Sequence, residues 1–85
     1  MSTATLPSVL GKEFRKARLK AGLTQEELAA KAKLTREYVS LLELDKRMPT
    51  LPVFVRLCRA MRISASDLLS KLEDSLAGMS NTSIR

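Results

Sequence analysis

Four side chains within a six-residue stretch carry groups that can recognise the edges of DNA bases: Arg36, Glu37, Ser40 and Leu41. An arginine can donate two parallel hydrogen bonds to guanine O6 and N7, and a carboxylate can accept one from cytosine N4. Glu37 could instead orient Arg36 and bond no base, which we favour because phosphates repel a carboxylate. Ser40 can bond any base or a phosphate. Leu41 can either contact a thymine methyl group or be an ordinary surface or packing residue.

These four residues share one side of a helix if residues 35–43 are helical. Successive helical residues rotate by about 100°, so Tyr38, Val39 and Leu42 lie together on the other side. If this second set is buried, the four base-reading candidates face outwards. The stretch therefore predicts a helix with one packed side and one side that can enter the major groove.

Two capped helices joined by a short link would position this surface. Thr24 and Glu27 form a capping box, in which each side chain bonds the backbone N–H of the other residue. Thr35 provides a second N-cap. We therefore predict helices over 24–32 and 35–43, and the short link makes them meet at a steep angle. This arrangement is typical of a helix-turn-helix.

Phosphate contacts would come from the start of the first of these helices and from residues close to the second. Gln25 lies where unpaired backbone N–H groups of a helix point outwards. The further candidates are Thr24, Thr35, Tyr38, Lys46 and Arg47. The two threonines act first as caps, and the tyrosine combines a ring on the core side with a hydroxyl group that could reach a phosphate.

Charge and composition agree with a small helical domain that binds a polyanion. The 85 residues contain 15 Lys and Arg against 9 Asp and Glu, which leaves a net charge of +6. Such an excess suits a nucleic acid partner, although a solvated surface would give the same balance. An aliphatic, Leu- and Ala-rich body with only three Gly and three Pro favours helices over sheets.

The residue types argue against several other classes of protein. The chain has no His and one Cys, so we expect neither a metal site nor a cofactor. The sequence has neither a carboxylate pair in a cleft-forming context nor a Gly-rich phosphate loop, so we do not expect an enzyme. Cys58 lies on the apolar side of a predicted helix, as expected of a packed core thiol. One cysteine fits a reducing cytoplasm, and no signal peptide or membrane-spanning run is found.

Three more helices complete the predicted fold. Their boundaries follow from Pro7, Gly22, Thr50 and Ser64, which are helix-starting or helix-ending residues. The fourth helix carries Arg56, Arg59 and Arg62 at three-residue spacing, which we interpret as a solvated face. The sequence thus predicts an all-α, five-helix domain over 8–77, with a flexible arm at 1–7 and a flexible tail at 78–85.

The segments LGKEFRKARLKAGLTQEELA, SLLE, KR-x-P and TL…RL…AM…ISASDLL, in this order, resemble the phage-repressor-like (XRE-type) helix-turn-helix family. The resemblance runs from about Leu10 to Leu68. It implies a five-helix bundle with a central helix-turn-helix, the third helix in the major groove, and base contacts at the four positions named above. It also implies an ion pair between Arg18 and Glu43 at an otherwise apolar junction, rather than two exposed charges.

Two residues depart from the pattern of this family. Asp45 and Arg62 stand where the family often has Gly after the third and fourth helices. We expect Asp45 to adopt the left-handed conformation with a local side-chain hydrogen bond. Leu44 occupies a position that is often polar and contacts phosphate, so it receives no such role.

A domain of this size reads only a few base pairs, so we expect a homodimer on a palindromic operator. Leu69, Leu72 and Leu76 extend an apolar stripe beyond the core, and we expect a partner chain to cover it, so these three residues are the predicted dimer interface. The alternative is that the chain folds back and covers the stripe with its own domain. The chain ends soon after the fifth helix, and a ligand-sensing domain is not expected. Small stand-alone members of the family include repressors and restriction–modification controller proteins. The sequence therefore predicts a transcriptional regulator, which either represses or activates by contacting RNA polymerase. The alternative is an antitoxin whose main partner is a toxin.

Overall fold

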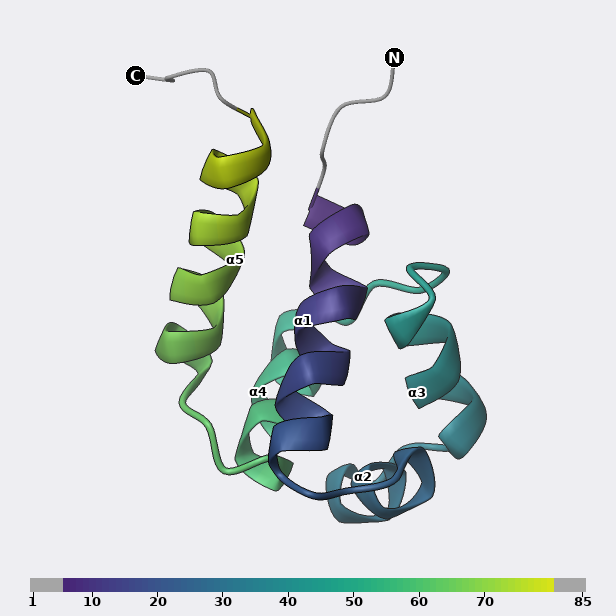
Figure 1. Cartoon of the computed structure of the whole chain (residues 1–85). Helices are drawn as coiled ribbons and strands as arrows, with labels where there is room; N and C mark the ends of the chain where they lie inside the picture. The colour runs from purple at the N-terminus through teal and green to yellow at the C-terminus, as the bar shows by residue number, and fades with distance from the viewer. Residues whose placement is uncertain (1–5, 81–85) are drawn as a thin grey trace.

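Five helices form the described part of the chain, which comprises residues 6–80 of this computed structural model. They are α1 (Leu6–Lys20), α2 (Gln25–Ala32), α3 (Arg36–Glu43), α4 (Leu51–Ala60) and α5 (Ala65–Ser80). No strand occurs within these residues. Figure 1 shows α1 running through the middle of the molecule, with α3 and α5 on opposite sides of it. The predicted all-α, five-helix fold is confirmed.

The core is almost entirely aliphatic and lies between α1 and the other four helices. Phe14 and Phe54 meet edge to face in it, with 5.6 Å between their ring centroids. Around them lie buried side chains from all five helices, among them Leu28, Val39 and Leu68. Each helix is short and could not persist alone in water, so the helices depend on this shared burial.

Hydroxyl side chains begin four of the five helices. Thr24, Thr35, Thr50 and Ser64 each accept a hydrogen bond from the backbone N–H three residues later, at 3.0–3.3 Å. Glu27 also accepts from the N–H of Thr24 at 2.9 Å, which completes the predicted capping box. These caps satisfy N–H groups that have no partner inside a helix.

Three side-chain-bearing residues adopt left-handed backbone conformations after helices. Lys33, Asp45 and Arg62 have φ values of 60°, 63° and 59°. The conformation predicted for Asp45 is confirmed, but its carboxylate does not bond locally as expected. It accepts from the backbone N–H of Gly11, at 3.0 Å and 34 residues away. The residue therefore joins the end of α3 to α1.

Gly11 allows this close approach of α1 to the end of α3. A Cβ atom at this position would lie 2.6 Å from Asp45 Oδ1 and 2.6 Å from the carbonyl oxygen of Glu43. Both distances are too short for a carbon atom in contact. Only glycine fits this crossing without displacing α3.

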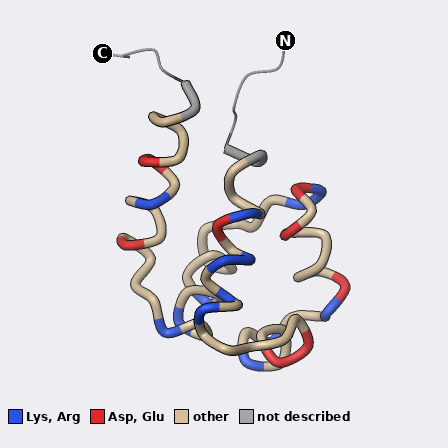
Figure 2. Tube along the Cα trace, in the orientation of Figure 1, with Lys and Arg blue, Asp and Glu red and all other residues tan. Residues whose placement is uncertain are grey.

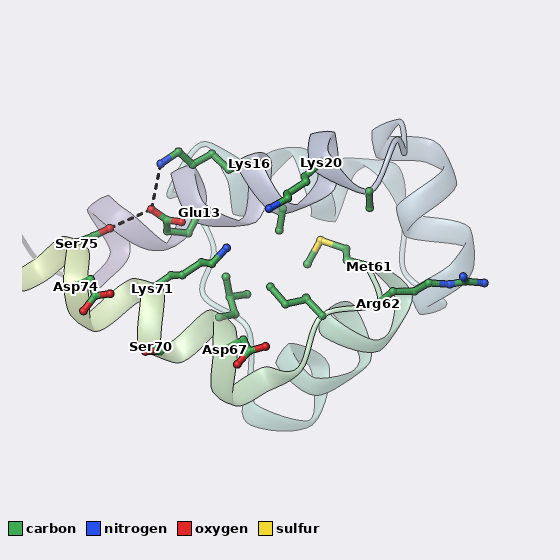
Figure 3. A pocket seen from close by; sticks show the side chains of 14 residues that line it. Glu13, Lys16, Lys20, Met61, Arg62, Asp67, Ser70, Lys71, Asp74 and Ser75 are labelled. Carbon is green, nitrogen blue, oxygen red and sulfur yellow. Dashed lines mark hydrogen bonds and ion pairs between the residues drawn. The ribbon is translucent and has the colours of Figure 1, made fainter.

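Two of the three leucines assigned to the dimer interface, Leu72 and Leu76, pack within this chain, which is the alternative that the sequence left open. Leu72 is buried in the core and Leu76 is half-buried against it, because α5 packs on α1. Ser75 donates a hydrogen bond to the buried Glu13 at 3.0 Å and so joins the same two helices (Figure 3). Leu69 is 47% exposed. The apolar residues exposed on α5 are therefore fewer than the sequence pattern indicates.

The ends of the first and last helices also differ from the predicted boundaries. Leu6 and Pro7, assigned to the arm, lie in α1, and 78–80, assigned to the tail, lie in α5. The remaining parts of the predicted arm and tail, 1–5 and 81–85, lie outside the described residues.

Replacing Arg62 by glycine should stabilise the protein, because glycine adopts a φ near 60° without the steric cost that a side chain carries. We expect Arg62→Gly to raise the free energy of unfolding by about 0.5–1 kcal/mol in urea titrations. Asp45→Gly is the contrast, since it relieves the same strain but removes the bond to Gly11. It should gain less or lose stability, and an equal gain in both variants would show that this bond contributes nothing.

Candidate nucleic-acid interface

Helices α2 and α3 form the predicted helix-turn-helix, and α3 presents one side to solvent. Val39 and Leu42 on its inner side are both 2% exposed. Among the four base-reading candidates, Arg36 and Glu37 are exposed, whereas Ser40 and Leu41 are half-buried. The structure thus confirms the two-sided helix, and the half-burial of Leu41 agrees with a partial packing role.

A nearly buried ion pair joins the end of α3 to α1. Arg18 Nε and Nη2 donate to the two carboxylate oxygens of Glu43, at 2.6 Å and 3.0 Å. Arg18 Nη1 also donates to the carbonyl of Leu23 at 2.9 Å. The hydrogen bonds to Glu43 raise the pKa of Arg18 above its ordinary value, although burial opposes this. The ion pair that the family resemblance implied is confirmed.

A hydrogen-bonded chain leads from this ion pair to the exposed side of α3. Gln25 Nε2 donates to Glu43 Oε1 at 3.1 Å, and Gln25 Oε1 accepts from Arg36 Nη1 at 3.3 Å. Both ends of the Gln25 amide are therefore engaged. Arg36 is oriented by Gln25, and among the described residues it has no hydrogen bond to Glu37, which sequence reasoning favoured for this role.

The bond between Gln25 and Arg36 could not be found from local spacing. These residues lie 11 positions apart on different helices, and only the angle between α2 and α3 brings them together. The amide nitrogen of Gln25 carries two hydrogen atoms, and its bond to Glu43 uses one. The second can still donate to a phosphate, as the sequence predicts for this residue.

The other phosphate candidates lie at the start of α2, at the start of α3 and within it, and in the loop after α3. The hydroxyl oxygens of Thr24 and Thr35 accept from backbone N–H groups as caps, so their hydrogen atoms remain available to donate. Arg47 lies over the ring of Tyr38, with 5.3 Å from its Cζ to the ring centroid. Lys46 beside it is exposed.

Positive charge is concentrated along α1 and on both sides of the α3 sequence. Figure 2 shows Lys and Arg positions repeating along α1, and positive positions also occur in the loop between α3 and α4, where Lys46 and Arg47 lie. Lys12, Arg15 and Lys20 on α1 are exposed. This distribution would attract a polyanion over a broad area, as the net charge predicts.

Arg56 does not belong to a purely solvated face, contrary to the interpretation of its three-residue spacing. Its guanidinium group donates to the carbonyls of Ala32 and Lys33, which end α2. Periodicity along α4 correctly placed its backbone away from the core, but it could not show that the end of α2 lies within reach of its side chain.

A hollow of the described surface lies elsewhere, between α1 and α5 (Figure 3). Its lining has charges of both signs, among them Lys16, Lys20, Lys71, Asp67 and Asp74. Since α5 and α3 lie on opposite sides of α1 (Figure 1), this groove is separate from the exposed side of α3.

Three further features of the described residues concern a metal site, a reactive thiol and a membrane-spanning helix. These residues contain no group of three His, Cys, Asp or Glu side chains that could hold a metal ion. Burial raises the pKa of Cys58 to about 11, which keeps the thiol protonated and unreactive near neutral pH. No helix in 6–80 combines the length and apolar character needed to cross a membrane.

Comparison with known proteins assigns this fold and its paired helices to one family. The sequence profile of the helix-turn-helix family matches residues 14–68, more than half of the chain. An uncharacterised HTH-type transcriptional regulator of Sinorhizobium fredii, y4dJ, is 31% identical over 70 residues, covering 82% of this chain and 91% of that protein.

Two solved structures share the arrangement of helices. The clp gene regulator ClgR from Corynebacterium glutamicum has a TM-score of 0.83 and 28% identity, over 89% of this chain and 81% of that one. The restriction–modification controller protein C.Esp1396I, solved as a tetramer with its natural 35-base-pair operator, has a TM-score of 0.78 and 29% identity, over 86% and 96%. This chain therefore belongs to the XRE-type helix-turn-helix family of DNA-binding transcriptional regulators.

Proposed function

We propose that this protein binds a specific palindromic operator as a homodimer and regulates transcription, with α3 in the major groove. The observation that carries the proposal is the position of Arg36. It is exposed at the start of α3, and Gln25 links it to the buried ion pair of Arg18 and Glu43. An arginine held in this way has lost part of its freedom before it meets a base, which lowers the entropic cost of binding.

Base reading would start from Arg36 and continue along the outer side of α3. Arg36 pairs with a guanine through its guanidinium fork, and Ser40 lies one helical turn further on. Leu41 is half-buried and offers its exposed part to a thymine methyl group. The direction of Arg36 towards Gln25 leaves Glu37 free to accept from a cytosine amino group.

Phosphate contacts on both sides of α3 would set its depth and direction in the groove. The second N–H of the Gln25 amide and the hydroxyl groups of Thr24 and Thr35 lie at helix N-termini, which favour anions. Lys46 and Arg47 follow the end of α3, and Arg47 stacks on Tyr38. Such contacts position the protein on DNA without carrying sequence information.

A second copy of the chain would supply the other half-site. The relative C.Esp1396I forms a tetramer on its own operator. On this chain, Leu69 of α5 is exposed, whereas Leu72 is buried in the core. A two-fold axis near Leu69 would bury this side chain against its own copy. Binding to a palindrome requires that the same axis place the two copies of α3 about one helical turn apart.

Genomic selection tests the proposal most directly. Purified protein is bound to fragmented DNA of the source organism at physiological salt, and the retained fragments are sequenced. Enrichment of a short palindrome is the expected result. Retention without a common motif would contradict sequence-specific regulation. If the protein instead copurifies with a second protein and is poorly behaved without it, an antitoxin is favoured.

Arg36→Ala should reduce discrimination between operator and random DNA by about 1–3 kcal/mol, because the variant loses a bidentate base contact. Lys46→Ala should weaken binding to both DNAs about equally and should reduce the slope of log K against log salt by about 0.9, since one phosphate contact is lost. Both effects are measured by fluorescence anisotropy over a salt series. Equal behaviour of the two variants would refute the division into base-reading and phosphate-contacting residues.

Leu69→Glu should separate the dimer into folded monomers, because it places a carboxylate at the proposed two-fold contact. We expect the dimer dissociation constant in sedimentation to rise at least about tenfold. Leu19→Glu is the matched control, since Leu19 is 56% exposed on α1 and the change in charge is the same. A dimer that persists in Leu69→Glu would place the interface on another surface.

A further inference from the structure

We infer that Arg56, on α4, is a positioning residue for base reading: it fixes the start of α3 without touching DNA. The inference rests on the proposed function and adds to it a determinant of specificity outside the helix-turn-helix. It starts from a side chain that lies on a different helix but contacts the turn between α2 and α3.

The guanidinium of Arg56 caps the C-terminal end of α2. Its Nε and Nη2 atoms donate to the carbonyl of Ala32 at 3.1 Å and 3.0 Å, and Nη2 also donates to the carbonyl of Lys33 at 3.1 Å. The last carbonyls of a helix have no partner within it, and they form the negative end of its dipole. A charged, planar donor therefore matches this end in both charge and geometry.

The turn that receives these bonds is strained. Lys33 has φ +60° and ψ +48°, a left-handed conformation that brings the Cβ atom of a residue with a side chain too close to the backbone. The backbone N–H groups of Lys33 and Leu34 bond back to the carbonyls of Ala30 and Ala29. The bonds from Arg56 hold the carbonyl groups of the same turn, so they oppose its relaxation.

The start of α3 depends on this turn more than the end of α3 does. The end is tied to α1 through the Arg18–Glu43 ion pair and through the bond between Asp45 and Gly11. In the described residues, extensive helix contacts of α3 involve α1 and α2, while α4 packs on α2 and α5. Arg56 is thus the polar connection from α4 to the segment that leads into α3.

Movement of this turn would reach the base-reading arginine almost directly. Leu34 and Thr35 separate Lys33 from Arg36, and Arg36 is the first residue of α3. A bidentate contact with guanine requires two donors in a fixed orientation, so a shift of the first turn of α3 would weaken the specific contact. Long-range attraction to phosphates would be less sensitive, because it depends on charge rather than on direction.

Arg59 offers a matched control on the same helix. It lies three residues after Arg56 and is exposed, and among the described residues its side chain, unlike that of Arg56, makes no hydrogen bond. Arg56→Gln and Arg59→Gln remove the same charge from neighbouring turns of α4. Arg56→Lys keeps the charge but replaces the guanidinium fork by a single ammonium group.

The experiment measures each full-length variant in two ways. Amide hydrogen exchange of Lys33 and Leu34 is followed by NMR without DNA, and thermal unfolding checks that each variant is folded. Binding is then measured at one salt concentration to a DNA fragment selected by the wild-type protein and to the same fragment with scrambled half-sites. The ratio of the two dissociation constants reports discrimination.

For Arg56→Gln we expect faster exchange in the turn and a loss of discrimination of about fivefold or more. Arg59→Gln should weaken binding to both fragments and leave their ratio and the exchange rates unchanged, and Arg56→Lys should fall between wild type and Arg56→Gln. If Arg56→Gln does not fold, Arg56→Lys decides alone: discrimination below that of wild type supports the inference, and equal discrimination overturns it.

Two results overturn the inference and differ from a failure of the proposed function. Exchange in the turn that is unchanged in Arg56→Gln refutes the structural role, whatever the protein does with DNA. Equal loss of discrimination in Arg56→Gln and Arg59→Gln reduces the role of Arg56 to its charge. Failure of the wild-type protein to prefer its selected fragment would instead refute sequence-specific binding itself, while the exchange rates would still report on the turn.

Discussion

The ion pair between Arg18 and Glu43 is the interaction on which the arrangement of the interface depends. Two charges taken out of water lose much of their solvation, and they are tolerated only when their remaining donors and acceptors are also satisfied. Here Arg18 also bonds the carbonyl of Leu23, and Glu43 also accepts from Gln25. The pair therefore joins four elements: α1, the loop before α2, the start of α2 and the end of α3.

A second constraint comes from how closely α1 and α3 approach. Gly11 has no space for a Cβ atom, and its N–H bonds the carboxylate of Asp45 just after α3. The ion pair and this contact hold one end of α3 from the same helix. The other end is held through α2 and its turn, where Gln25 and Arg56 make the polar contacts. Helix α3 is thus a short element whose direction is determined by its neighbours.

The side chains proposed to bind DNA and the contacts that fix their orientation thus lie in different parts of the molecule. Arg36, Ser40 and Leu41 have the chemistry of base recognition, but their own helix has only eight residues and little stability by itself. Their precision must come from contacts made elsewhere in the domain. The polar contacts from α1, α2 and α4 to α3 and its turn provide a physical basis for it, because directional hydrogen bonds fix orientation better than apolar packing does.

The sequence alone determined what local chemistry controls: five helices, four hydroxyl caps, the two sides of α3 and its family. Caps and periodicity act within a few residues, so they can be read in order along the chain. Tertiary structure decided the rest. In the folded chain Leu72 is buried, and the Asp45 carboxylate bonds Gly11 instead of a local partner. Arg36 is bonded by Gln25 and not by Glu37, and Arg56 bonds the end of α2. Each of these contacts joins residues from different helices, and its existence depends on crossing angles that no local pattern encodes.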